Sequence, residues 1–237
     1  MNRRTAYKRL WLMAALTAAA LQADAAAPPC IVRTWQSDEG LQDNTVTGVG
    51  QTPDGFLWVA TRTGLSRFDG VQFREFPVVS DGMPADRITK LLADRRGRLW
   101  IAKEGGAVVC VEQGRATAVG VPELGESGGG VRFMTEDAAG AVWLSYNGGA
   151  VVRLQDGQVR RFTGADGLPE RDFCRVAVDG AGRLWFAKDG WVGVFREGRF
   201  CPLERIPAQF IAGARSGGVW CYWRNNLCKN TPGKARA

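Results

Sequence analysis

Tryptophans recur at a nearly constant spacing, and this periodicity constrains the fold more than any other feature of the sequence. Four of them lie 42, 43 and 42 residues apart, and a fifth follows after 35 residues: Trp58, Trp100, Trp143, Trp185 and Trp220. A glycine stands three residues before each one: Gly55, Gly97, Gly140, Gly182 and Gly217. A period near 40 residues is the signature of a repeat architecture. We therefore interpret the chain as successive copies of one unit.

Each copy divides into four short strands. In the first copy, residues 46–52 alternate in polarity, and Gly55 can adopt a positive φ in the turn that follows. Three more short segments follow, each bounded by turn residues, over 56–61, 65–68 and 71–76. Four antiparallel strands in about 42 residues make one propeller blade, whose tryptophan packs against a neighbouring blade. No stretch after residue 30 sustains helical spacing without a Gly or Pro.

The sequence therefore predicts an all-β protein, a β-propeller with four complete four-stranded blades and a partial fifth. The complete blades are predicted at 44–78, 88–121, 131–162 and 173–203, followed by the partial blade at 208–228 and a disordered tail at 229–237. Residues 30–37 are interpreted as a strand that would close a ring. Either this strand closes a five-bladed ring, or the chain is a truncated part of a larger, seven-bladed ring. The irregular fifth copy and the basic tail favour truncation.

Residues 1–25 have the pattern of a secretory signal peptide. Four basic residues precede an apolar run of eleven residues, and Ala23 and Ala25 are the small residues of a cleavage site. The run is shorter than the about 20 apolar residues that a membrane-spanning helix needs. We expect export to the periplasm or the cell exterior and no membrane span in the mature chain, with an uncleaved N-terminal anchor as the alternative.

Composition argues against several classes of function. The net charge of +7 falls when the leader is removed, and Lys and Arg are scattered, so nothing indicates nucleic-acid binding. The chain contains no His, which rules out Ser-His-Asp and Cys-His catalysis and makes a structural zinc site unlikely. We expect no enzymatic activity, no metal and no cofactor. Six cysteines are free to pair or to stay as buried thiols: Cys30, Cys110, Cys174, Cys201, Cys221 and Cys228.

Acidic residues recur in the first turn of the copies. Asp94, Asp137 and Asp179 each lie six residues before the tryptophan of their copy, and Asp54 lies four before. Carboxylates can ligate metals or act in catalysis, but a catalytic group is needed once rather than in every blade. Repetition therefore favours a structural role, in which each side chain accepts hydrogen bonds from the backbone of its own turn.

The second turn of each copy is the variable part of a constant scaffold. It shares one rim with the connectors between blades, whose sequences at 38–46, 80–88 and 165–173 resemble one another. Variable positions on such a rim are where ligand contacts are expected. The candidate ligand-binding residues are Arg62, Lys103, Glu104, Tyr146, Asn147, Lys188 and Asp189. The alternative is that these are ordinary solvated turn residues, with Lys103 and Lys188 extended over a tryptophan.

The copies resemble the two-component regulator propeller repeat. The pattern is clearest in DGMPADRITKLLADRRGRLWIAKEGG and DGLPERDFCRVAVDGAGRLWFAKDG, and the resemblance covers roughly residues 31–223. It implies the periplasmic sensor region of a membrane-bound histidine kinase or diguanylate cyclase. It also implies an unknown small-molecule or carbohydrate ligand, and formation of a homodimer.

The chain departs from this family in its output. It has no phospho-accepting His and no glycine-rich nucleotide loop, so we expect it to lack a kinase or output domain of its own. The function that follows is extracytoplasmic ligand sensing for a two-component-type receptor. The alternatives are a propeller enzyme of the polysaccharide lyase or glycosidase type and a non-catalytic interaction scaffold.

Overall fold

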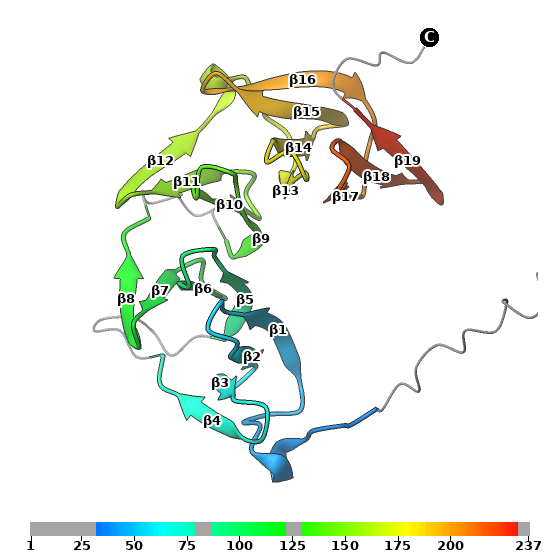
Figure 1. Ribbon diagram of the computed structural model, residues 1–237. Helices are drawn as coiled ribbons and strands as arrows, with labels where there is room; N and C mark the ends of the chain where they lie inside the picture. Colours follow the sequence, from blue (N-terminus) through cyan, green and yellow to red (C-terminus); the bar gives the residue numbers. More distant parts are fainter. Residues whose placement is uncertain (1–31, 79–86, 122–128, 232–237) are drawn as a thin grey trace, which may run out of the picture. The chain divides into compact units, whose positions relative to one another are not determined.

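The computed structural model describes residues 32–78, 87–121 and 129–231 (Figure 1). The chain divides into two units, Met1–Thr34 and Trp35–Ala237, and all of the repeats lie in the second. The predicted signal peptide lies outside the described residues. Within the described ranges, no helix is long and apolar enough to cross a membrane.

Nineteen strands in the described ranges form five antiparallel sheets, and the strands of each sheet are ordered as in the chain. The first sheet contains β1 (Val46–Gln51), β2 (Leu57–Thr61), β3 (Leu65–Phe68) and β4 (Phe73–Phe76). The second contains β5 (Ile88–Ala93), β6 (Leu99–Lys103), β7 (Val108–Glu112) and β8 (Arg115–Val119). The third contains β9 (Val131–Glu136), β10 (Val142–Tyr146), β11 (Val151–Gln155) and β12 (Gln158–Phe162). The fourth contains β13 (Arg175–Val178), β14 (Leu184–Lys188), β15 (Trp191–Arg196) and β16 (Arg199–Arg205). The fifth contains β17 (Phe210–Gly213), β18 (Val219–Trp223) and β19 (Asn226–Asn230).

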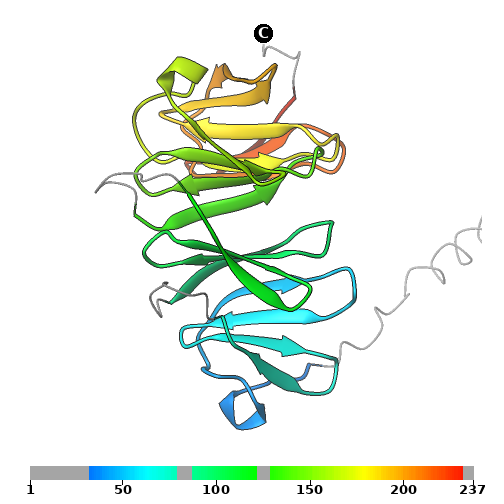
Figure 2. The ribbon, with the colours of Figure 1, turned by 90° about the vertical axis from the view of Figure 1, so that its left-hand side faces the viewer.

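The sheets of the second unit follow one another in chain order, as Figures 1 and 2 show. Their first strands lie next to one another in the order β1, β5, β9, β13 and β17. This arrangement of four-stranded antiparallel meanders is that of successive propeller blades. The predicted all-β propeller with four complete blades and a partial fifth is confirmed. We refer to the five sheets as blades 1 to 5.

The hydrophobic core consists of four layers, each between two successive blades. The tryptophan of one blade packs against the strands of the next: Trp58 against blade 2, Trp100 against blade 3, Trp143 against blade 4 and Trp185 against blade 5. Each layer removes the apolar faces of two sheets from water, which stabilises the fold by roughly 25 cal/mol per Å² of buried apolar surface. A blade is therefore stable only beside its neighbours.

Two connectors on the described part of the chain have the same conformation. The single-turn 3-10 helices η1 (Ser37–Glu39) and η2 (Gly164–Asp166) each end at a glycine with positive φ, Gly40 (101°) and Gly167 (83°). The leucine that follows each glycine is buried. This similarity explains why the connector sequences resemble one another, because the turn requires the glycine and the core requires the leucine.

Two predicted boundaries are wrong. Residues 32–36 belong to no strand and lead into η1, so the strand predicted over 30–37 does not form in this part of the chain. The Trp35 ring instead packs edge-on against Phe68, 5.2 Å away, which fixes this segment on blade 1 without strand pairing. The disordered tail predicted from residue 229 is wrong for its first two residues, because Lys229 and Asn230 pair with β18 as the end of β19. The rest of that tail, 232–237, lies outside the described residues.

Candidate functional site

The repeated aspartates join the first turn of a blade to its tryptophan. One carboxylate oxygen of Asp179 accepts hydrogen bonds from the backbone N–H groups of Ala181 and Arg183, both at 3.0 Å. The other oxygen accepts the indole N–H of Trp185 at 2.9 Å. Asp94 and Asp137 make the same contacts with their own turns and with Trp100 and Trp143. The predicted turn-capping role is confirmed, and the bond to the indole explains the constant six-residue spacing.

The surroundings of Asp179 favour its ionised form. Burial raises the pKa of Asp179, but hydrogen bonds from Trp185, Arg183 and Gly218 outweigh it and lower the pKa to about 2. The N–H of Gly218 belongs to blade 5, so this carboxylate also ties two blades together at 2.8 Å. Because each of the three repeated carboxylates accepts at least three hydrogen bonds from its own turn and tryptophan, these aspartates are poor candidates for general acid or base chemistry.

The first and last blades deviate from this pattern. In blade 1, Thr52 takes the aspartate position, and its hydroxyl accepts the indole N–H of Trp58 at 3.0 Å. Asp54 lies beside it and its carboxylate accepts the N–H of Phe56. In blade 5, Ala214 stands at the same position and offers no acceptor to Trp220.

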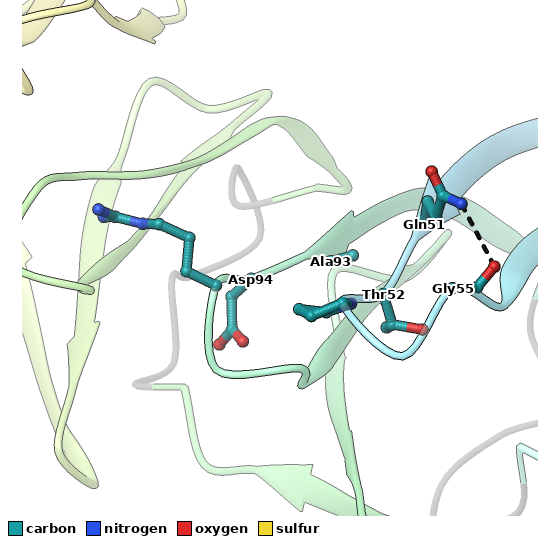
Figure 3. Close-up of a pocket in the computed structure, with 7 residues that line it drawn as sticks. Gln51, Thr52, Gly55, Ala93 and Asp94 are labelled. Carbon is teal, nitrogen blue, oxygen red and sulfur yellow. Dashed lines mark hydrogen bonds between the residues drawn. The ribbon is translucent and has the colours of Figure 1, made fainter.

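A depression of about 440 Å³ lies on this rim between blades 1 and 2 (Figure 3). It is lined by the two first turns, which include Thr52, Gly55 and Asp94. The Gln51 side chain donates a hydrogen bond to the carbonyl of Gly55 at 3.2 Å across its wall, as the dashed line in Figure 3 shows. Since its polar groups already serve their own turns, we do not assign this depression a ligand.

On the opposite rim, a side chain three residues after the tryptophan connects each of two blades to the one before it. Lys188 of blade 4 donates hydrogen bonds to the carbonyls of Gly149, at 3.0 Å, and Asp172. Tyr146 of blade 3 donates its hydroxyl to the carbonyl of Gly106 at 3.3 Å. Lys188 is 3% exposed and Tyr146 is 1% exposed. We call this contact the inter-blade latch.

The latch requires glycine at its acceptor position. Gly106 and Gly149 each lie six residues after a tryptophan and have positive φ, 90° and 84°. A Cβ on Gly149 would lie 2.5 Å from the Lys188 amine and from the Asp172 carbonyl oxygen. Backbone conformation and space therefore both exclude a side chain there. The sequence prediction that Lys188 and Tyr146 contact a ligand is not supported by this geometry, since both side chains are buried.

Arg62 and Lys103 line one depression of about 470 Å³ between blades 1 and 2, together with Gln42 and Glu75. Lys103 occupies the same position in its blade as Lys188 and is likewise only 3% exposed. Arg62 is exposed, and its backbone N–H donates to the carbonyl of Thr45 at 3.2 Å. Two of the predicted residues, Arg62 of blade 1 and Lys103 of blade 2, therefore lie at the same depression.

The remaining predicted residues lie one position further along the second turns. Glu104 and Asn147 are exposed, and Asp189 is half-buried with a positive φ of 51°. The backbone N–H groups of Glu104 and Asn147 donate to the carbonyls of Arg87 and Gly130, which extends the pairing of the first two strands. The backbone here is structural, while the side chains of Glu104 and Asn147 face solvent.

A cluster that the sequence interpretation missed lies on the same rim, where blades 3 and 4 meet. The guanidinium carbons of Arg132 and Arg175 lie 3.8 and 4.2 Å from the centre of the Phe173 ring. Asn147 accepts a hydrogen bond from Arg132 at 3.3 Å and so joins this cluster. The cluster was missed because its two arginines, Arg132 and Arg175, are 43 residues apart in the sequence and Phe173 belongs to a connector. Arginines at the start of two successive first strands were the available signal.

Cysteine chemistry is absent from this rim. The cysteines of the described ranges are all free thiols: Cys110, Cys174, Cys201, Cys221 and Cys228. Burial raises the pKa of the Cys174 thiol to about 12, so this residue stays protonated and unreactive. In the same ranges, no three acidic or cysteine side chains converge on a point where they could hold a metal ion.

Residues 40–63 match the family model described as the two component regulator propeller. This segment runs from the first connector to the second turn of blade 1. The match falls on the first copy, whereas the pattern in the sequence is clearest in the second and fourth. A search of curated proteins found no match.

Solved structures with a similar fold include enzymes and extracellular domains of two component systems. Virginiamycin B lyase from Staphylococcus aureus has a TM-score of 0.66 and 18% identity, over 81% of this chain and 68% of that one. The gluconolactonase XC5397 from Xanthomonas campestris has a TM-score of 0.54 and 14% identity, over 79% and 72%.

An extracellular domain of a two component system has a similar TM-score. The extracellular domain of BT3049 from B. thetaiotaomicron, assigned as a hybrid two component system, has a TM-score of 0.67 and 16% identity, over 86% of this chain. This chain spans 31% of that extracellular domain. Identities this low establish the fold alone. The chain thus carries a two component regulator propeller repeat and has the β-propeller fold, as its sequence predicts.

Proposed function

We propose that this chain is an extracytoplasmic ligand-sensing region for a two-component-type receptor and has no catalytic activity of its own. The observation that carries the proposal is the two component regulator propeller repeat at residues 40–63. The extracellular domains of BT3049 and BT4673 share the fold, which supports a sensor. The secretory pattern of residues 1–25 supports a location outside the cytoplasm.

The distribution of constant and variable side chains supports ligand binding on the connector rim. On the aspartate rim, three blades use the same Asp–Trp hydrogen bond, with little room for variation. On the connector rim, equivalent exposed positions carry Arg62, Glu104 and Asn147, whose backbone N–H groups pair with the residue just before the first strand in the same way in blades 1, 2 and 3. A rigid scaffold that presents different polar groups around one rim is suited to recognition.

The main rival is an enzyme, because a lyase and gluconolactonases have the same fold. A variant of the Staphylococcus aureus lyase in which one histidine is replaced by alanine is catalytically inactive. None of the 237 residues of this chain is His, so no imidazole here can take that role. The repeated carboxylates are committed to their turns and tryptophans. These observations favour binding over catalysis.

The test is a ligand screen with the full chain, secreted with its own leader. Soluble oligosaccharides, acidic sugars and small peptides are added, and thermal unfolding is followed. A ligand at 100 times its Kd stabilises a protein by about 2.7 kcal/mol, which raises the Tm of a domain of this size by roughly 5–10 °C. We expect at least one compound to give a saturable shift and to be recovered unchanged by mass spectrometry.

The other outcomes separate the alternatives. A compound that is consumed by the protein would replace the sensor proposal with an enzyme. A complete screen without a saturable shift would instead favour the interaction scaffold. Retention of the protein in the cytoplasm when the leader is intact would contradict the extracytoplasmic location.

A further inference from the structure

The cluster at the junction of blades 3 and 4 places two cations against one aromatic ring. Arg132 is the second residue of β9 and Arg175 is the first residue of β13, and these strands are neighbours. Their guanidinium carbons lie 3.8 and 4.2 Å from the centre of the Phe173 ring. Among the described residues, no other ring has two guanidinium groups over it within 6.0 Å.

The charges of these two arginines are not balanced by an ion pair. Among the described residues, five arginines pair with a carboxylate within 4.0 Å, and neither Arg132 nor Arg175 is one of them. Arg175 donates from Nε to the carbonyl of Gln209 at 2.6 Å, and Arg132 donates from Nη1 to the side-chain oxygen of Asn147. Both acceptors are neutral. The two Nη groups of Arg175 and the Nη2 of Arg132 remain available as donors.

The two guanidinium groups also repel each other. Burial and then the positive charge of Arg132 lower the pKa of Arg175, while the nearby carboxylate of Asp172 acts in the opposite direction. Arg132 is exposed and Arg175 is half-buried, so the pair is within reach of a ligand. A bound anion would relieve this repulsion, and planar guanidinium groups match the two oxygens of a carboxylate or sulfate.

The Phe173 ring that both arginines contact is held in place before any ligand binds. The inter-blade latch from Lys188 fixes the carbonyl of Asp172, which has a positive φ of 60°. Phe173 is the next residue, so the latch fixes the backbone position from which the Phe173 side chain extends. The ring is stacked with Phe133, 6.4 Å away with an interplanar angle of 22°. Fixed donors reduce the ordering cost of binding.

We propose that Arg132, Arg175, Phe173 and Asn147 form a binding site for an oxyanion, a carboxylate or sulfate group, on the ligand of this propeller. This proposal rests on the proposed function, because it names the class of ligand that the sensor takes. The two guanidinium groups bind the oxyanion, and the amide of Asn147 keeps Arg132 in position. The remainder of the ligand extends along the connector rim.

The experiment compares glucuronate with glucose, which differ by one carboxylate, and uses inorganic sulfate as a second probe. Binding to the full chain is measured by isothermal titration calorimetry, together with the variants Arg132→Gln and Arg175→Gln. The control is Arg161→Gln, which removes the same charge from an exposed position on β12. Arg132 is exposed, so we expect Arg132→Gln to fold like the native chain. If Arg175→Gln lowers the Tm, the binding measured for Arg132→Gln decides between the outcomes.

We expect glucuronate or sulfate to bind at least tenfold more tightly than glucose. Each arginine variant should weaken that binding at least tenfold, while Arg161→Gln changes it less than twofold. Whichever of glucuronate and sulfate binds more tightly indicates whether the ligand carries a carboxylate or a sulfate ester. Anion binding that is equal to that of glucose, or equal in all three variants, would overturn the oxyanion site. A neutral compound from the ligand screen that binds independently of Arg132 would leave the sensor function standing and the oxyanion site refuted.

Discussion

Blades 4 and 5 contain the same tryptophan at the same place in the repeat, in opposite environments. Trp185 is 0% exposed and donates its indole N–H to Asp179. Trp220 is 40% exposed, and the aspartate position before it is taken by Ala214. The strands that carry the two rings are equivalent, β14 and β18.

The difference comes from the next blade and not from the repeat itself. Trp185 packs against β18 and its neighbours, whereas the equivalent face of blade 5 is open in the described part of the chain. Phe210, Tyr222 and Leu227 form one cross-strand row on that face and are 64%, 37% and 66% exposed. A tryptophan in this repeat therefore contributes its hydrophobic free energy only when a following sheet covers it.

The largest expected effect tests this difference directly. Trp185→Ala should reduce the free energy of unfolding by about 3–5 kcal/mol, because it empties the layer between two blades. Trp220→Ala should reduce the free energy of unfolding by less than about 1 kcal/mol, because the Trp220 side chain is already partly exposed and little buried surface is lost. Urea unfolding followed by far-UV circular dichroism measures both. Equal losses would mean that the two rings are in equivalent environments and would break the comparison.

If Trp185→Ala does not fold, the milder pair Trp185→Phe and Trp220→Phe serves the same purpose. Phenylalanine keeps an aromatic ring and removes the indole N–H, so Asp179 loses one of the hydrogen bonds that its carboxylate accepts. The expected loss is about 1–2 kcal/mol in blade 4. In blade 5 no aspartate accepts that N–H, so we expect no measurable loss.

A second, smaller effect concerns the latch that blade 4 makes with blade 3. Gly149→Ala would place a Cβ 2.5 Å from both the Lys188 amine and the Asp172 carbonyl oxygen. Gly157 is the matched control, because its φ of 77° is similar and nothing lies within 4 Å of a Cβ there. The positive φ should cost each variant about 1–2 kcal/mol, and the close contact should add about 1–3 kcal/mol at Gly149 only. Denaturant unfolding that gives the same loss for both variants would refute the latch.

A further expected effect, confined to acidic pH, is the pH dependence that Asp179 gives to blade 4. Its pKa is about 2 in the folded chain against the ordinary value of 3.8, so its contribution is present above about pH 4. That contribution is lost as the pH falls toward 2. Asp179→Asn should therefore be less stable than the native chain by about 2 kcal/mol at pH 6. The gap should close near pH 2, because a protonated aspartate and an asparagine are alike in shape.

Thermal unfolding of both proteins between pH 2 and pH 7 measures this gap. Glu112→Gln, which neutralises an exposed residue on β7, is the control and should stay within about 0.5 kcal/mol of the native chain throughout. A gap that is the same at pH 6 and pH 2 would show that the ionised carboxylate of Asp179 does not stabilise the fold.

The sequence predicted the blades well because their signal is local. Turn glycines, the Asp–Trp spacing and alternating strands all lie within one copy of the repeat, so comparing copies revealed them. The latch was misread because Lys188 and its acceptor Gly149 are 39 residues apart and belong to different copies. Only the three-dimensional contact between Lys188 and Gly149 shows that the Lys188 position, which varies between copies, is buried. The same reason hid the cluster around Phe173, whose two arginines come from adjacent blades.

The strand expected over 30–37 illustrates another limit. Alternation can indicate that a segment is able to extend, but a strand also needs a partner with free backbone groups. Trp35 finds its place through aromatic contacts with Phe68 and Phe73 of blade 1. Tertiary packing of one side chain therefore decides the conformation of this segment.

The inter-blade latch has a direction, and this bears on how the chain is made. In both described cases the donor belongs to the later blade and the acceptor carbonyl to the earlier one. During synthesis the N-terminal blade emerges first. The acceptor carbonyl of each latch is therefore made before its donor, and the latch closes only when the later blade packs against the earlier one.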